Sequence, residues 1–399
     1  MSKRGRGDGI GGGVARLERE IAATLQRRSP SEDRLAATAC ALASASERVL
    51  DSLAVVGKAL AKKKAFDRPL FTAALRALAE RGDPRLDELL ALTLAAEDGG
   101  GLAALSTAGF SRDPKLAGPL ARLATSRHPH VAFAAELARV ARRESTGPSL
   151  VALAPKLKES YRIAIASDVL LPLVRGPVLA SSVGPALAVL RDAERHLGRW
   201  LVIGEVAVRA GDPSPRQEAE ARATSGPTSA RTGWTLVAWA LSPGASPPAL
   251  RPSIDLVTRL SDRPSASRDL TFLFRLADAR ASHVRPLLEG LVRSGELATE
   301  AAVRAALYLA RDHGRADARA ALGEAASSKL DGIRGLATAA LFDAGDRVGA
   351  IAAAESAADA KAPSVHAWAE LVSMAEASAM PLQLVTEPTY RRLAMGWIE

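Results

Sequence analysis

The residues of this 399-residue chain that could do chemistry are few, and none of them completes a catalytic pattern. Residues 7–12, Gly-Asp-Gly-Ile-Gly-Gly, match the G-x-G-x-x-G pattern of dinucleotide-binding loops. That loop binds a pyrophosphate only where it joins a strand to a helix, and here a basic, polar segment precedes it. The sequence also contains no G-x-S-x-G motif of a serine hydrolase. We therefore predict no cofactor and no catalytic residue, and we favour a non-enzymatic protein.

Histidine and cysteine, common ligands of transition metals, are too scattered in this sequence to predict a metal site. His128 and His130 flank Pro129 without a third ligand nearby, which is typical of residues at a helix start. Cys40 is the single cysteine and lies in an apolar stretch, so it can form no disulfide within the chain. We expect Cys40 to be a small buried residue and the two histidines to be turn residues.

The basic charge of the chain is concentrated near its N-terminus. The net charge is +9, and residues 1–64 hold thirteen Lys and Arg against seven Asp and Glu. Two basic clusters lie in this segment, namely Arg27 with Arg28, and Lys62 with Lys63 and Lys64. They could contact the phosphates of a nucleic acid. For the lysines we favour the C-terminal end of a helix, where the dipole favours positive charge.

The elements that must position these residues are helices. Residues 1–12 are glycine-rich and basic, and we predict a disordered tail there. Leu35, Leu42, Val49 and Val56 then repeat every seven residues, which predicts one long helix or a tight helical pair to about residue 64. No segment shows the sustained alternation of a strand, so the predicted fold class is all-α.

Prolines mark the starts of the next helices. An aspartate before the proline can accept backbone N–H groups, and proline needs no donor in the first turn. This pattern predicts helices over 70–81, from 86, over 116–125 and over 129–141. Gly82 is expected to end the first of them.

The centre of the chain looks irregular. Apolar helices continue to residue 210, but residues 212–232 contain no Val, Ile, Leu, Met or aromatic residue. We predict a Pro/Ser-rich junction over 211–265 that holds one apolar helix with Trp234 and Trp239. Tryptophans five apart share no helix face, so one is expected in the core and the other as an exposed anchor. Prolines interrupt this apolar stretch well before the length of a membrane span.

A repeat of about thirty residues appears near the C-terminus. Val303-Arg304 opens Val-Arg-Ala-Ala-Leu, and Ile333-Arg334 opens a similar segment, followed by Ala344-Gly345-Asp346 at the expected turn. Val365-His366 starts a third copy. The stretch resembles HEAT repeats, specifically the short variety of lyase-type HEAT proteins. The resemblance is looser over 113–142 and covers about half of the chain.

The HEAT resemblance implies a right-handed α–α superhelix, arranged as one solenoid or as two arrays joined by the irregular centre. The corresponding domains are the tail 1–12, an N-terminal array 13–210, the junction 211–265 and a C-terminal array 266–399. Arg304 and Arg334 would form a ladder of guanidinium groups. This ladder lines a binding face or, as we favour, pairs with acids such as Asp312 or Asp343 between repeats.

The leading functional hypothesis is a scaffold or adaptor that binds a protein partner on its concave face, because most HEAT proteins serve in that way. The alternative is a nucleic-acid-binding protein similar to the HEAT-like DNA glycosylases, using the basic N-terminal region. A third hypothesis, an enzyme or accessory protein of the lyase-type group, needs an acid or thiol cluster, and Cys40 lies outside the recognisable repeats. We expect a cytoplasmic protein, since no secretion signal is visible. The alanine- and arginine-rich composition is typical of a GC-rich, bacterial-like genome.

Overall fold

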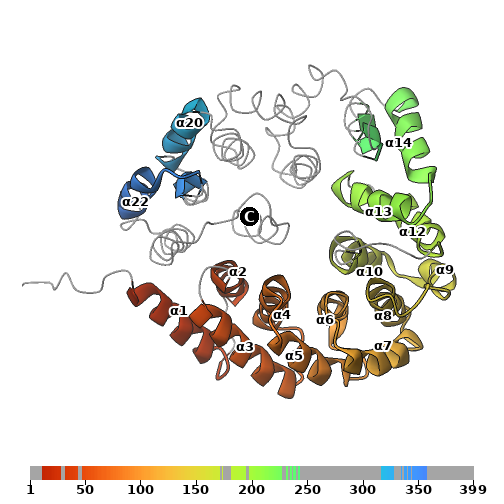
Figure 1. Cartoon of the computed structure of the whole chain (residues 1–399), viewed down its shortest axis with the longest axis horizontal. Helices are drawn as coiled ribbons and strands as arrows, with labels where there is room; N and C mark the ends of the chain where they lie inside the picture. The colour runs from red at the N-terminus through yellow and green to blue at the C-terminus, as the bar shows by residue number, and fades with distance from the viewer. Residues whose placement is uncertain are drawn as a thin grey trace, which may run out of the picture. The chain divides into compact units, whose positions relative to one another are not determined.

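The computed structural model shows an all-α protein (Figure 1). It describes residues 11–27, 32–43, 47–170, 173, 181–194, 197–226, 231, 234–235, 237–239, 241–242, 316–327, 334, 337–338, 340–342 and 344–356. Within these ranges the regular elements are all helical and no strand is present, so the predicted fold class is confirmed. Among the helices described in these ranges, none combines the length and the hydropathy that a membrane span requires.

The N-terminal helices are α1 (Gly11–Ala23), α2 (Glu32–Ala43), α3 (Glu47–Lys62), α4 (Pro69–Arg81), α5 (Arg85–Leu94) and α6 (Gly101–Ala108). A 3₁₀ turn η1 (Pro114–Leu116) leads into α7 (Ala117–Ala124), followed by α8 (Pro129–Ala141), α9 (Leu150–Leu153) and the 3₁₀ turn η2 (Ala154–Lys156). Next come α10 (Glu159–Ala164), the π-helical segment η3 (Ile165–Val169), α12 (Val183–Asp192), α13 (Leu197–Arg209) and α14 (Ser214–Ser225). Two further helices are α20 (Ala316–Ala326) and α22 (Arg347–Ser356).

The helix ends follow the local signals in the sequence. α4 begins at Pro69, and Gly82 ends it in the left-handed conformation, with φ of 61°. The carboxylates of Asp83 and Asp113 accept the backbone N–H groups two residues on, at 2.9 and 3.0 Å. α8 runs from Pro129 to Ala141, as predicted. α1 begins at Gly11, so residues 11 and 12 of the predicted tail 1–12 are helical, and residues 1–10 lie outside the described residues.

The seven-residue repeat near the N-terminus corresponds to a pair of helices, α2 and α3. Val49 and Val56 are buried in α3, together with Leu53 and Leu60. Cys40 is buried in α2, as expected for a small apolar residue.

The predicted irregular centre contains a helix that the sequence interpretation missed. α14 lies inside the stretch 212–232, although it has no large aliphatic or aromatic side chain. Its alanines, glutamates, arginines and glutamine have high helix propensity, and proline occupies its first turn. Arg222 and Glu218 form an ion pair one turn apart, at 2.5 Å. The prediction of an irregular segment here, which depended on the absence of large apolar residues, is therefore wrong.

The chain divides into two compact units, and the division differs from the predicted domains. One unit is Gly57–Leu256, and the other combines Met1–Val56 with Val257–Glu399. The predicted array 13–210 is thus split near residue 56, and much of the predicted junction belongs to the first unit. The physical reason is that α14 packs against α13, so contacts continue where the composition changes.

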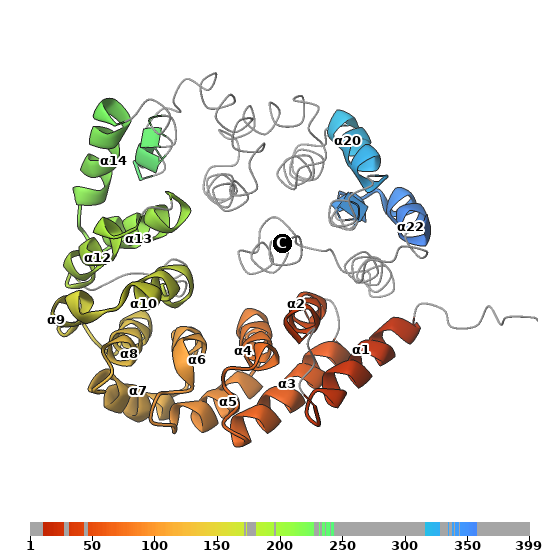
Figure 2. The same ribbon diagram turned by 180° about the vertical axis from the view of Figure 1, so that it is seen from behind.

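Within Gly57–Leu256, consecutive helix pairs pack side by side. α4 contacts α6 and α6 contacts α8 in one row, and η3 continues this row to α13. α5 and α7 contact each other in a second row, and α7 packs on α8 (Figures 1 and 2). α8 shows the depth of this packing, because ten of its thirteen residues are buried, among them Phe133 and Glu136.

Candidate functional site

Arginine side chains connect neighbouring helix pairs by donating to backbone carbonyls. Arg122 of α7 donates to the carbonyl of Leu94, 28 residues away, at 2.6 Å. Arg142 donates to the carbonyls of Ser111 and Asp113, 31 and 29 residues away, at 2.6 and 2.7 Å. Leu94 is the last residue of α5, and a helix leaves its last carbonyls without intrahelical donors, so the Arg122 guanidinium group satisfies one of them.

Exposed ion pairs repeat the same separation along the chain. Each of the pairs Arg48–Glu18, Lys58–Glu88 and Arg127–Glu97 joins residues that are 30 apart. The N–O distances are 2.6, 2.8 and 3.1 Å. The Lys58 ammonium group donates a hydrogen bond to Glu88 and lowers the pKa of that carboxyl group below its ordinary value. A spacing of about thirty residues therefore extends well beyond the C-terminal segment where the sequence shows it.

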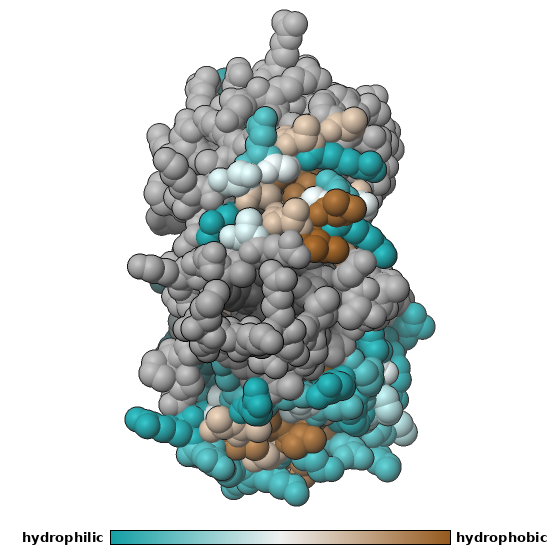
Figure 3. Space-filling view, turned by 90° about the vertical axis from the view of Figure 1, so that its left-hand side faces the viewer, coloured by the Kyte–Doolittle hydropathy of each residue, from teal (hydrophilic) through white to brown (hydrophobic). Residues whose placement is uncertain are grey.

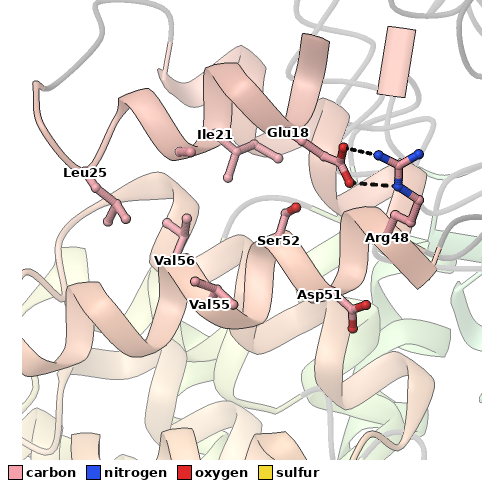
Figure 4. Close-up of a pocket in the computed structure, with 9 residues that line it drawn as sticks. Glu18, Ile21, Leu25, Arg48, Asp51, Ser52, Val55 and Val56 are labelled. Carbon is pink, nitrogen blue, oxygen red and sulfur yellow. Dashed lines mark hydrogen bonds and ion pairs between the residues drawn. The ribbon is translucent and has the colours of Figure 1, made fainter. Parts of the chain in front are cut away.

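A groove lies between α1 and α3 and is hereafter called the α1–α3 groove (Figure 4). Its volume is about 280 Å³. It is lined by Glu18, Ile21, Ala22, Leu25, Arg48, Asp51, Ser52, Val55 and Val56. Ile21 and Val56 are buried at its base, whereas Val55 is 66% exposed. A large apolar side chain is thus open to solvent beside an apolar floor.

One end of the α1–α3 groove is charged and the other is apolar. At the charged end, the Arg48 Nε and Nη2 atoms donate to the two carboxylate oxygens of Glu18 at 3.2 and 2.6 Å. Leu25 lies toward the opposite end, near Val56 (Figure 4). Glu18 faces Arg48 at one end of the groove, and Leu25 lies near Val56 at the other. The two helices therefore pass the groove in the same order of residues, so α1 and α3 run in the same direction. The lining residues carry two carboxylates and one guanidinium group, a net charge of −1.

The basic residues singled out from the sequence do not line this groove. Arg27 is exposed shortly after α1. Lys62 is the last residue of α3, and Lys63 and Lys64 form the exposed turn that follows. The lysines therefore occupy the helix C-terminus, where a positive charge is favoured. Arg28 lies outside the described residues.

The two tryptophans singled out from the sequence are both enclosed, to different degrees. Trp239 is 5% exposed and belongs to the core, as predicted for one of them. Trp234 is half-buried, and its ring meets the edge of Trp200 at 4.8 Å between centroids. The Arg222 guanidinium group lies 4.5 Å from the centroid of the Trp234 ring. Trp234 is therefore covered by neighbours and is poorly suited to serve as an exposed anchor.

Few residues of the C-terminal repeat lie in the described ranges. Arg334 is half-buried in a helix, and its carbonyl oxygen accepts a hydrogen bond from Thr338 at 2.8 Å. Gly345 adopts φ of 86°, and Asp346 accepts the N–H of Gly349, so the predicted turn is present. Arg304 and its proposed acidic partners, Asp312 and Asp343, lie outside the described residues.

His128 lies just before α8, as expected, whereas His130 belongs to the first turn of the helix itself. The His130 ring stacks on Tyr161 with centroids 3.8 Å apart. No group of three or more His, Cys, Asp or Glu in the described part of the chain could hold a metal ion. Burial lowers the pKa of His130 below its ordinary value of 6.5, and His128 and Lys158 act in the same direction against the opposing charge of Asp98.

The lowered pKa of His130 predicts a loss of stability in acid. The unfolded chain binds a proton at His130 at a higher pH than the folded chain, so stability should fall as the pH drops below about 6.5. Urea unfolding at several pH values would measure this effect. The His130→Phe variant keeps a ring to stack on Tyr161 but cannot titrate, and its unfolding should depend less on pH. An identical pH dependence in both proteins would contradict the prediction.

No protein-family model, curated protein or solved structure matches this chain. The residues of the α1–α3 groove were not among the candidates selected from the sequence. The one sequence signal that could have found them is the opposite charge of Glu18 and Arg48 at a separation of 30 residues.

Proposed function

We propose that this chain is a non-enzymatic scaffold or adaptor of HEAT-repeat type, a right-handed α–α superhelix that binds a protein partner. The observation that carries the proposal is the recurrent contact between residues about thirty apart. It occurs in exposed ion pairs such as Arg48–Glu18 and in buried bonds such as Arg142 to Ser111. A repeat stacked in this way buries its apolar faces against its neighbours and leaves an extended surface for a partner.

The α1–α3 groove supports a protein rather than a cofactor as the ligand. Its base is apolar and its charged end is rich in carboxylates, which suits the side chains of another protein better than a phosphate.

The proposal is tested by capture and rebinding with the full-length chain. The tagged protein is incubated with a nuclease-treated extract of its source cells, and a captured protein is identified, purified and titrated back onto the chain. A scaffold should bind the purified partner saturably and without turnover of it. If no purified candidate rebinds, the scaffold proposal is wrong.

Nucleic-acid binding is the second candidate, and the exposed cluster Lys62, Lys63 and Lys64 favours it. Phosphate contacts release counterions, so affinity for duplex DNA should fall steeply as salt rises. Fluorescence anisotropy with labelled duplex DNA at two salt concentrations measures this. The absence of binding at low salt would exclude this candidate, and salt-dependent binding that is lost in a Lys62→Gln, Lys63→Gln, Lys64→Gln variant would favour it.

A further inference from the structure

We propose that α14 is a lid that covers the rings of Trp200 and Trp234 and opens as a unit, while α12 and α13 stay folded. The opened state exposes these two indole rings to solvent. This inference goes beyond the proposed scaffold function and does not depend on it, because it concerns the chain without a partner. All the residues that carry it lie in the compact unit Gly57–Leu256.

α14 is held in place with little apolar burial. Only Pro215 and Ala219 of its twelve residues are buried, although it packs against α13. Large apolar side chains would resist local opening, because apolar burial is the main stabilising contribution in a folded protein. Elsewhere apolar side chains lie open to solvent, as the brown atoms on the face shown in Figure 3 do. At α14 the arrangement is the reverse, since a polar helix covers aromatic rings.

Polar contacts hold α14 instead, and several of them converge on Arg191 near the end of α12. The Arg191 Nη2 atom donates to the Ser214 hydroxyl group at 3.1 Å, and the Nε atom lies 2.9 Å from a carboxylate oxygen of Glu218. Asp212, which precedes the helix, lies 3.6 Å from Nη1. Such contacts replace contacts with water, so each adds little net stability.

The inner face of α14 lies over the two tryptophan rings. The Arg222 guanidinium carbon is 4.5 Å from the centroid of the Trp234 ring and 5.9 Å from that of Trp200. A Cβ atom added at Gly204 of α13 would lie 3.4 Å from both the Pro215 Cβ and the Trp200 Cζ3 atoms, so Pro215 also lies beside this ring. Trp200 is fully buried and meets Trp234 edge to face. Withdrawal of α14 therefore uncovers the pair.

Buried donors at the contact with α14 favour opening. Within the described part of the chain, the Arg191 Nε and Nη1 atoms and the Trp200 Nε1 atom are buried and have no hydrogen-bond partner. The Arg191 side chain is only 6% exposed, and its approach to Glu218 is an ion pair without hydrogen-bond geometry. A buried donor without an acceptor costs free energy that contact with water recovers. Opening of α14 admits water to these groups, which lowers the free energy of opening.

Native-state hydrogen exchange of the full-length chain tests the lid, with amide and indole N–H groups followed by NMR. We expect the amides in the middle of α14 to share one protection factor, about a hundredfold lower than that of the α8 amides. The Trp200 indole N–H should share it, because the same opening exposes both. Trp200→Phe identifies this signal among the five tryptophans. Protection that falls steadily toward Ser225 would show fraying of the helix end and would contradict the proposal.

Two arginine variants of α14 form a matched pair. Arg222→Ala should speed exchange of the α14 amides and the Trp200 indole by about fivefold or more, because it removes the cation–π contact with Trp234. Arg216→Ala is the control, since Arg216 and Glu220 form a pair that is about half exposed, and it should change exchange by less than about twofold. Both variants lose one ion pair within the helix, so the difference measures the contact with the rings.

Three outcomes would overturn the lid. If the α14 amides are as protected as those of α8, the helix does not open locally. If these amides exchange early but the Trp200 indole does not, α14 does not cover that ring. Equal exchange in Arg222→Ala and Arg216→Ala would show that contact with the rings does not hold the lid closed. Each of these results leaves the scaffold proposal standing, because none involves a protein partner.

Discussion

The Arg142→Ala variant is expected to lose about 3–5 kcal/mol of unfolding free energy, because it breaks a buried ionic network. The Arg142 side chain is only 2% exposed and pairs with Glu144 at 2.6 Å. It also donates to the carbonyls of Ser111 and Asp113, which lie in the segment between α6 and η1. Alanine would leave these two carbonyl oxygens, one in a buried and one in a partly buried hydrogen bond, without their donor. Urea unfolding followed by circular dichroism measures the loss.

Arg127→Ala is the matched control for this prediction. Arg127 also reaches a residue 30 positions away, Glu97, but the two side chains are 77% and 81% exposed. Such a pair contributes about 0–1 kcal/mol, so little change is expected. Arg142→Met separates the loss of the hydrogen bonds and the ion pair from the loss of side-chain volume. It removes the guanidinium group but keeps a long side chain, and it should be nearly as unstable as Arg142→Ala. Equal losses for Arg142→Ala and Arg127→Ala would show that the buried network does not hold the helix pairs together.

The Gly100→Ala variant is expected to lose about 2–5 kcal/mol, from strain and steric overlap together. Gly100 adopts φ of 71°, which an alanine rarely accepts. Its added Cβ atom would also lie 1.8 Å from the Cγ2 atom of Thr93. Thr93 is fully buried, and its hydroxyl group donates to the carbonyl of Leu89 at 2.6 Å, so its side chain cannot easily rotate away. The start of α6 must then move away from α5.

Two variants divide this loss into its causes. Gly101 has φ of 84° but open space around its Cβ position, so Gly101→Ala should show the backbone strain alone, about 1–2 kcal/mol. Thr93→Ser keeps the hydroxyl group and removes the methyl group that overlaps, so it should recover part of the stability of Gly100→Ala. Thermal and urea unfolding provide the values. If Gly100→Ala is no less stable than Gly101→Ala, steric overlap with Thr93 is not the cause.

Local sequence patterns predicted many helix ends because their causes are local. Proline at residue 129 and the aspartates at residues 83 and 113 act on backbone groups within a few positions. The same reasoning failed for α14, whose interior lacks large apolar residues. Helix propensity and ion pairs within one turn form this helix, and a search for apolar periodicity does not detect them.

The candidate site could not be predicted in the same way. Lys62, Lys63 and Lys64 attract attention as a charge cluster, but they follow the end of α3 and do not line the α1–α3 groove. Trp234 is conspicuous in the sequence, yet Trp200 and Arg222 cover it. Val55 resembles the buried Val49 and Val56 in the sequence, and only the position of α1 determines that it is exposed beside a groove.

The sequence by itself determined that the chain is helical, where many of its helices begin and end, and that a spacing of about thirty residues recurs. These properties depend on side-chain spacing and on hydrogen bonds between near neighbours. The tertiary structure decided which arginines are buried and donate hydrogen bonds to backbone carbonyls, as Arg142 does. It also decided which arginines are exposed, as Arg127 is. It also decided that α1 and α3 enclose an apolar groove. The physical reason is that burial depends on neighbours brought together through space, and a residue about thirty positions away leaves no mark on the local pattern.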